Sequence, residues 1–239
     1  PAGVHYRNVS EDWHGLALSG PKSRAVLAEL TREDVSAAGF AFRDTKMTFV
    51  AGVPVILTRI SFSGELGYEI YCKPQYLRRL TEAVELAGAD KGLRWYGARA
   101  LMSMRLEKGW GAWGLDFRPD FTAAEAGLDG FINWNKEFVG KSAAQAGARP
   151  AKRLVTLTLE VEGIDVSNDE AILHEGAAVG YISSGGYAHH VGRSMAMGYV
   201  PAELSAGGQR LEVEILGQMY SAEVQSAPLY DPEGLKMRS

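Results

Sequence analysis

Glu69 is the acidic residue best placed to do chemistry, because it lies in a stretch with the pattern of a tight hairpin. We expect a strand over Ile56–Phe62, a turn over Ser63–Gly67 and a returning strand over Tyr68–Cys72. Glycine tolerates the positive φ that such a turn needs. Rigid backbone would then hold the Glu69 carboxylate just past the turn, where it either binds a ligand or faces water on a half-buried hairpin.

The returning strand alternates clearly. Tyr68, Ile70 and Cys72 share one face, while Glu69 and Tyr71 share the other. Cys72 is the only cysteine, so an internal disulfide is excluded and the cysteine usage fits a reducing compartment. Its place on the apolar face predicts a buried thiol rather than a nucleophile.

Other common catalytic patterns are missing from the sequence. It contains no dinucleotide-binding glycine motif before a helix, no P-loop and no G-x-S-x-G elbow. His189 and His190 are adjacent, so along a strand they would point to opposite faces, and we expect no metal site. Asp116, Asp120 and Glu125 are interpreted as solvated loop charges rather than as a carboxylate cluster.

Composition describes an ordinary globular protein of 239 residues, with 23% charged and 46% hydrophobic side chains. The net charge of −4 gives no electrostatic reason to expect nucleic acid as a partner. No apolar run approaches the roughly 20 residues that span a bilayer, so we expect no membrane partner. The first residues lack the pattern of a secretory signal, and with the cysteine usage this indicates a cytoplasmic protein.

The elements that must position Glu69 follow a strand and helix rhythm. Pro21–Leu30 has helical apolar spacing, residues 46–51 alternate as a strand, and Pro74 opens a second helix. A third helix is predicted over about Tyr96–Lys108. This order is typical of a split antiparallel α+β sandwich with its helices on one face of the sheet.

The composition changes around Gly147–Ala151. Beyond it, alternating apolar residues and frequent glycine pairs predict an antiparallel β-barrel, so we expect an α+β domain over 1–150 and an all-β barrel over 151–239. Gly109–Asp129 is rich in Gly, Trp and Asp and is predicted to be irregular. Its Trp110 and Trp113 either fill the space between the domains or line a pocket.

Several segments, in order, resemble the glycine cleavage T-protein (aminomethyltransferase) family. The hairpin S-F-S-G-E-L-G-Y-E-I resembles the family's Y-T-G-E-x-G-x-E segment. The family's R-L-E-x-G…G-x-D, F-I-G-K/R, barrel-signature and closing segments are matched at 105–116, 138–141, 180–200 and 229–234. The R-L-E-K-G-W…W-G-x-D form is most similar to the folate domains of dimethylglycine and sarcosine dehydrogenases.

The resemblance implies a tetrahydrofolate site. Its pterin edge offers an N–H and an amino group side by side, and an ionised carboxylate accepts both. In the family that task belongs to the second acid of the hairpin motif, which is Glu69 here. Phe62 occupies the family's Tyr position and keeps a stacking surface without the hydroxyl. Trp113 falls where the family has an aromatic residue in the segment before Gly-x-Asp, and the resemblance implies that it would stack against folate.

Two further features bear on function. The family has an Arg on the third helix that meets folate. An ungapped count from Arg105 places Leu101 there, and a shift of the helix register brings Arg99 to it; the alternative for Arg99 is an exposed, salt-bridged side chain. The family's catalytic Asp lies in a segment before this chain, so no catalytic residue is assigned within it.

We therefore expect the C-terminal part of a folate-dependent one-carbon transferase, or a shortened relative. Its partners would be folate, a small amine or methyl donor, and a fused or separate oxidase domain. The alternative function is a non-catalytic folate-binding or interdomain module.

Overall fold

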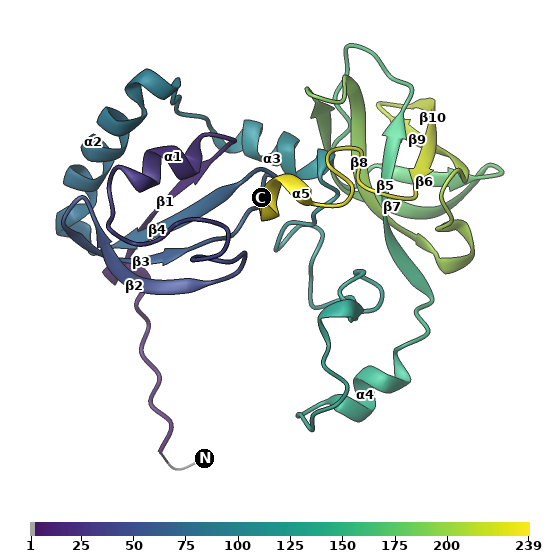
Figure 1. The fold of residues 1–239 in the computed structure, drawn as a ribbon. Helices are drawn as coiled ribbons and strands as arrows, with labels where there is room; N and C mark the ends of the chain where they lie inside the picture. Colours follow the sequence, from purple (N-terminus) through teal and green to yellow (C-terminus); the bar gives the residue numbers. More distant parts are fainter. Residues whose placement is uncertain (1–2) are drawn as a thin grey trace. The chain divides into compact units, whose positions relative to one another are not determined.

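A computed structural model describes residues 3–239 of the chain. These residues form two compact units, which are described separately below. The first contains the chain up to Tyr96 together with Glu233–Ser239, and the second contains Gly97–Pro232. Figure 1 labels the helices and strands of both units along the colour-coded chain.

The first unit is built on a four-stranded antiparallel sheet with the order β1-β4-β3-β2. Its strands are β1 (His14–Ser19), β2 (Thr45–Val50), β3 (Val53–Thr58) and β4 (Gly67–Cys72). Its helices are the 3₁₀ turns Ser10–Asp12, Pro74–Tyr76 and Ala89–Lys91, and the α-helices α1 (Ser23–Ala28), α2 (Leu77–Gly88) and α5 (Leu235–Arg238).

The core of this unit lies between one face of the sheet and the helices α1 and α2, which Figure 1 shows on the same side of the sheet. Leu27 of α1 and Leu80 of α2 pack in one cluster with Tyr68 and Ile70 of β4. Cys72 belongs to the same cluster, and burial raises the pKa of its thiol, as expected for a structural cysteine. The predicted alternation in β4 and the one-sided helices are confirmed.

The predicted first hairpin strand, Ile56–Phe62, is wrong at both ends, because β3 runs over Val53–Thr58. Pairing with β4 stops at Thr58, after which the amide of Arg59 donates to the carbonyl of Asp44. The Arg59 side chain is 1% exposed, and its Nη1 donates to the carbonyl of Phe40 at 2.7 Å. Arg59 thus turns inward where the β4 ladder ends, and residues 59–66 form a loop.

The second unit is a closed barrel with the strand order β10-β5-β8-β7-β6-β9. The strands are β5 (Lys152–Leu159), β6 (Ala171–His174), β7 (Ala177–Ala188), β8 (Arg193–Pro201), β9 (Arg210–Ile215) and β10 (Gln218–Gln225). The helices are α3 (Ala98–Glu107), α4 (Lys141–Ala146) and the 3₁₀ turns Asp129–Phe131 and Ala202–Leu204. The predicted fold class, a split antiparallel α+β sandwich followed by an all-β barrel, is confirmed.

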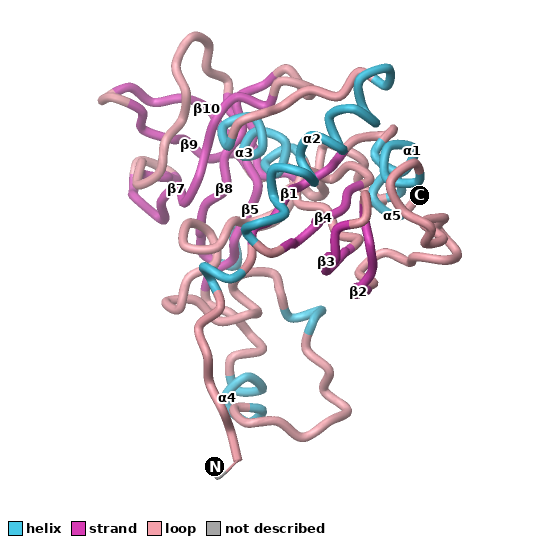
Figure 2. Tube along the Cα trace, turned by 90° about the vertical axis from the view of Figure 1, so that its left-hand side faces the viewer, coloured by secondary structure: helices cyan, strands magenta, loops and turns pink. Residues whose placement is uncertain are grey.

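The irregular segment predicted over Gly109–Asp129 is also found, and it belongs to the unit that contains the barrel. The chain around α4 extends away from the barrel in the ribbon of Figure 1 and in the tube of Figure 2. The two compact units of the structure divide after Tyr96, whereas the amino-acid composition of the sequence changes near residue 151. The domain ranges 1–150 and 151–239 stay a prediction.

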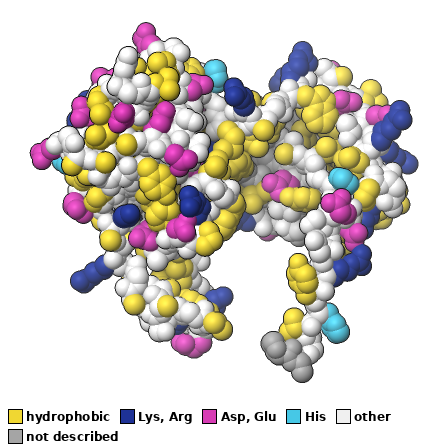
Figure 3. Space-filling view, turned by 180° about the vertical axis from the view of Figure 1, so that it is seen from behind, with side chains coloured by type: hydrophobic (Ala, Val, Ile, Leu, Met, Phe, Trp, Pro, Cys, Tyr) yellow, Lys and Arg dark blue, Asp and Glu magenta, His cyan; other side chains and the backbone are white. Residues whose placement is uncertain are grey.

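The surface shows no large patch of a single charge on the face drawn in Figure 3, where acidic and basic side chains are interspersed. Within residues 3–239, no helix is both long enough and apolar enough to cross a lipid bilayer.

Candidate functional site

One face of the first unit's sheet is left uncovered by α1 and α2, and we call it the outer face. It consists of the residues that pair across the four strands on the side away from the core: Gly15, Ala17, Ser19, Thr45, Met47, Phe49, Pro54, Ile56, Thr58, Gly67, Glu69 and Tyr71. Met47 is 84% exposed and Phe49 is 62% exposed. A sheet face that meets water is normally polar, so this apolar face is unusual.

Glu69 is the one charged residue among these twelve, and it is half-buried. Its neighbours across the strands are Ala17 on β1 and Thr58 on β3. The hydroxyl of Tyr71 donates to Glu69 Oε2 at 2.5 Å. Among the ion pairs between described residues, none includes Glu69. The carboxylate therefore lies on an apolar face with a phenol as neighbour and without a cation paired to it among the described residues.

The loop that leads into β4 is ordered by local hydrogen bonds. The amide of Gly64, which has a φ of +88°, donates to Ser61 Oγ at 3.0 Å. Ser23 Oγ of α1 donates to the carbonyl of Leu66 at 3.1 Å. Phe62 is half-buried in this loop, and Glu65 lies 3.9 Å from Lys236 Nζ. The loop thus fixes the start of β4, on which Glu69 stands two residues further along.

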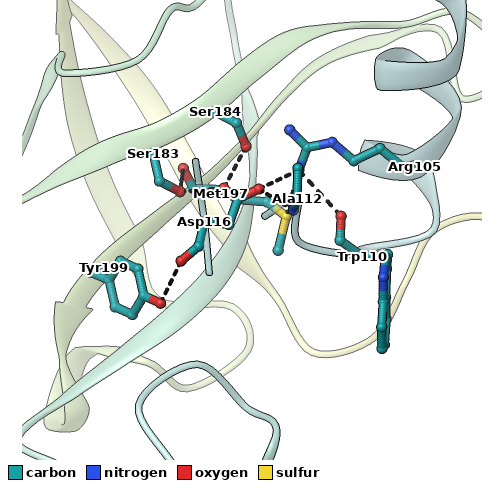
Figure 4. A network of polar contacts seen from close by, with 8 residues as sticks. All are labelled: Arg105, Trp110, Ala112, Asp116, Ser183, Ser184, Met197 and Tyr199. Carbon is teal, nitrogen blue, oxygen red and sulfur yellow. Dashed lines mark hydrogen bonds and ion pairs between the residues drawn. The ribbon is translucent and has the colours of Figure 1, made fainter. Parts of the chain in front are cut away.

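A second carboxylate, Asp116, lies at the centre of a buried polar network in the other unit (Figure 4). Its Oδ2 accepts hydrogen bonds from Arg105 Nη1 at 2.6 Å and from the amide of Ala112 at 2.7 Å. Its Oδ1 accepts from the hydroxyls of Ser183 at 2.5 Å and Ser184 at 2.6 Å. The hydroxyl of Tyr199 donates to its backbone carbonyl at 2.8 Å.

The interpretation of Asp116 as a solvated loop charge is therefore wrong. Its side chain is 0% exposed and that of Arg105 is 1% exposed. Burial lowers the pKa of Arg105 from its ordinary value, and the Asp116 carboxylate opposes this change by attracting the charged form. Asp120, in contrast, forms a surface pair with Arg118, and Glu125 accepts from the amide and hydroxyl of Thr122.

Glu107 has a comparable structural task at the end of α3. It is 3% exposed, and its Oε1 accepts from the amides of His190 at 2.7 Å and Val191 at 3.4 Å. The carboxylate thereby holds the turn between β7 and β8. Arg105 and Glu107 of the R-L-E pattern both serve the packing of this unit, because each is buried with protein partners.

Two of the predicted site residues, Trp113 and Arg99, belong to this second unit, whereas Glu69 and Phe62 belong to the first. Trp113 is 84% exposed and packs edge-on against Phe117, with ring centroids 5.7 Å apart. Arg99 is exposed in the first turn of α3, and it forms no ion pair with a residue that the structure describes. Their roles toward a ligand stay predictions.

The histidines are not arranged as a metal site. His189 and His190 lie in the turn after β7 rather than along a strand; the ring of His189 packs on Tyr187 and that of His190 on Tyr230. Within residues 3–239, no group of three or more His, Cys, Asp or Glu side chains is arranged to hold a metal ion.

Two features of these carboxylates could not be predicted from the sequence pattern. Alternation placed Tyr71 on the face of Glu69, but it did not predict their hydrogen bond. The Asp116 network was missed because its hydroxyl partners come from β7 and β8, nearly 70 residues or more further along the chain. The available signal was the pairing of Arg105 with Asp116 in the R-L-E…G-x-D pattern.

Comparisons with known proteins agree with this architecture. The family model described as "GCVT N-terminal domain" matches residues 1–136, which is more than half of the chain. The model described as "Glycine cleavage T-protein C-terminal barrel domain" matches residues 152–231, the range that holds the six barrel strands.

Individual relatives are longer than this chain. Mitochondrial dimethylglycine dehydrogenase of Rattus norvegicus is 40% identical over 98% of the chain, which spans 28% of that protein. Aminomethyltransferase of Desulforamulus reducens is 33% identical over 97% of the chain, which spans 64% of that protein.

A solved structure extends the likeness to three dimensions. The crystal structure of glycine cleavage system aminomethyltransferase T from Bartonella henselae matches with a TM-score of 0.81 and 26% identity, over 92% of this chain and 60% of that one. With both family models, the barrel and the four-stranded sheet in agreement, the chain belongs to the glycine cleavage T-protein family.

Proposed function

We propose that this chain binds tetrahydrofolate through the Glu69 carboxylate and takes part in folate-dependent transfer of a one-carbon group, either aminomethyl or methyl. The observation that carries the proposal is the isolation of Glu69. It is a half-buried carboxylate on an apolar sheet face, without an ion-pair partner among the described residues. Desolvating a charge without compensation is costly, so a ligand with N–H donors suits this position.

The chemistry of the pterin ring fits such a position. Its pyrimidine edge presents a ring N–H beside an amino group, and one carboxylate accepts both in a bidentate pair. A strand holds the acceptor more firmly than a loop does, and the paired neighbours of β4 keep Glu69 in place. Phe62 and Trp113 remain the proposed aromatic surfaces for the ligand, and Arg99 a proposed contact for it.

The part played by this chain would be binding and orientation. Tetrahydrofolate, when bound, supplies a nucleophilic nitrogen that captures the one-carbon unit. Glu69 would hold the pterin by its polar edge, and the apolar outer face would exclude water around it. Because the chain spans 28% of the dehydrogenase relative, we propose a fused or separate oxidase domain as the partner that delivers a carbon from a small amine or methyl donor.

A second candidate is a folate-binding module without catalysis of its own. The outer face favours it, since none of its other eleven residues carries a carboxyl, imidazole or amino group, and its one phenol, that of Tyr71, donates to Glu69. Binding of tetrahydrofolate by the chain without one-carbon transfer in the full-length protein would support this candidate over the first.

Titration calorimetry of the chain with tetrahydrofolate under reducing conditions tests the proposal. Hydrogen bonds to a charged group contribute about 1.5–3 kcal/mol, so Glu69→Gln should weaken binding by about 10- to 100-fold. Glu214→Gln is the matched control, because Glu214 is also borne by a strand but is exposed on β9. Absence of binding to the wild type, or equal affinity in wild type and Glu69→Gln, would reject the proposal.

A further inference from the structure

The contact between Tyr71 and Glu69 is formed within one strand. The two residues are two positions apart on β4 and share the outer face. Side chains at such positions stand roughly perpendicular to the sheet. For the phenol to reach Glu69 Oε2 at 2.5 Å, the ring has to lean over the sheet instead of standing upright.

Gly15 on β1 provides the room for that ring. Gly15 is paired with Tyr71 across the strands, and a Cβ built on it would lie 2.9 Å from Tyr71 Cε1 and 3.1 Å from Cδ1. Those distances are shorter than a normal carbon contact of about 3.5–4.0 Å. The φ of Gly15 is not in the left-handed region, so the backbone itself does not require glycine there. Glycine is favoured at this position by the close approach of the Tyr71 ring.

The remaining neighbours leave the phenol as the group that orients Glu69. Ala17 stands opposite Glu69 on β1 and has no polar side-chain atom. On β3 the hydroxyl of Thr58 is 3.1 Å from that of Thr45 and forms its hydrogen bond there. A carboxylate offers about four lone-pair sites, so one bond from Tyr71 fixes its orientation and leaves acceptor sites for a ligand.

We propose that Tyr71 is a positioning residue for the Glu69 carboxylate in ligand binding, and that Gly15 allows it to act by leaving space for its ring. This inference rests on the proposed function, since the ligand is the N–H-bearing edge of a reduced pterin. Holding the acceptor before the ligand arrives reduces the entropy lost on binding.

The protonation state of the phenol agrees with this role. The hydrogen bond to Glu69 is the main cause that raises the pKa of Tyr71 from 10.0 to about 12, and burial adds to it. The residues that face Tyr71 and Glu69 across β1 and β3 are Gly15, Ala17, Ile56 and Thr58, and none of these four is charged. Tyr71 thus remains a donor throughout the neutral pH range.

The test is a double-mutant cycle on tetrahydrofolate affinity, measured by calorimetry near neutral pH on the whole chain. Tyr71→Phe keeps the ring and removes the donor, and it should weaken binding by about 3- to 10-fold. Gly15→Ala should weaken it by a comparable factor, because it displaces the ring. In Glu69→Gln the additional Tyr71→Phe change should cost less than 2-fold, since the tyrosine acts through the carboxylate.

Matched controls exist in the second unit. Tyr220 on β10 donates to Gln218 Oε1 at 2.9 Å, again two residues along a strand, so Tyr220→Phe removes a comparable phenol far along the sequence. Gly130→Ala adds a Cβ where no atom lies within 4 Å. Both controls should leave the affinity unchanged.

The outcomes separate this inference from the proposed function. Wild-type affinity in Tyr71→Phe together with weak binding in Glu69→Gln would overturn the role of Tyr71 alone. Fully additive losses would also overturn it, because Tyr71 would then act independently of Glu69. Wild-type affinity in Glu69→Gln would instead reject the proposed function.

A second measurement covers the case in which Tyr71→Phe or Gly15→Ala fails to fold. In protein labelled at the tyrosine Cζ carbon, NMR titration follows the ionisation of Tyr71 in the wild type and in Glu69→Gln without any ligand. The Tyr71 pKa should fall from about 12 toward 10.0 in Glu69→Gln. An unchanged Tyr71 pKa would contradict the contact on which the positioning role depends.

Discussion

Asp116 in the loop after α3 and Glu69 on β4 are both carboxylates with protein hydrogen-bond donors, yet their surroundings differ. Asp116 is completely buried and accepts four hydrogen bonds, one of them from the Arg105 guanidinium. Glu69 is half-buried on an apolar face and accepts one, from Tyr71. A carboxylate whose acceptor sites are filled by the protein serves the fold. One that keeps open sites on an apolar face is suited to a ligand.

The largest expected effect concerns Asp116. Asp116→Asn leaves the Arg105 charge buried without its counter-charge, so the unfolding free energy of the barrel unit should fall by about 3–5 kcal/mol. Urea unfolding followed by hydrogen exchange of β7 and β8 peptides reports this unit by itself. Asp120→Asn is the control, because its pair with Arg118 is exposed and should contribute less than about 1 kcal/mol. Equal stability of Asp116→Asn and wild type would remove the contrast between the two carboxylates.

An intermediate effect is expected for Tyr71 at alkaline pH. Its pKa is about 12 in the folded chain and 10.0 as the ordinary value, so the folded state binds the proton more tightly. The contribution of the protonated Tyr71 phenol to the stability of the folded state is complete below about pH 10 and is lost as the pH rises through about 12. The unfolding midpoints of wild type and Tyr71→Phe should therefore converge over that range. The pKa of Cys72 is also raised, but both proteins contain Cys72, so its ionisation cancels in the difference between their midpoints.

Midpoints that stay equally far apart from pH 9 to 12 would show that the phenol does not donate to Glu69. The difference between the two carboxylates would then be larger, because Asp116 would keep its four donors while Glu69 would have no protein donor among the described residues.

The smallest effect on stability is expected for Glu69 itself. Glu69→Gln removes a charge that lacks an ion-pair partner among the described residues and keeps an oxygen that accepts from Tyr71. Because removing a poorly compensated charge offsets any loss at the Tyr71 hydrogen bond, the unfolding free energy of the first unit should not fall by more than about 0.5 kcal/mol, while ligand affinity falls. Hydrogen exchange of β4 measures the stability, and a loss of several kcal/mol would assign Glu69 to the fold as well.

The features of the fold and the site that could be predicted from the sequence are those set by local pattern. Alternation in β4 placed Glu69 and Tyr71 on one face because strand geometry has a period of two. The end of β3 could not be predicted, since it depends on Arg59 turning inward to the carbonyl of Phe40. The burial of Asp116 escaped prediction for the same reason, because a loop carboxylate is buried only when distant donors, here Ser183, Ser184 and Tyr199, surround it.

The exposed Met47 and Phe49 illustrate the same limit. Their alternation predicted a strand correctly, but pattern alone did not tell which face of that strand the helices would cover. The helices cover the other face, on which Val50 is buried. The apolar outer face was therefore visible only in the structure.

The most direct test of the role of Glu69 is a crystal structure of the chain soaked or grown with tetrahydrofolate. We predict the pterin on the outer face, with its ring N–H and amino group about 2.7–3.2 Å from the Glu69 carboxylate oxygens and the Tyr71 hydrogen bond retained. A pterin bound elsewhere, with the Glu69 carboxylate facing water, would contradict it.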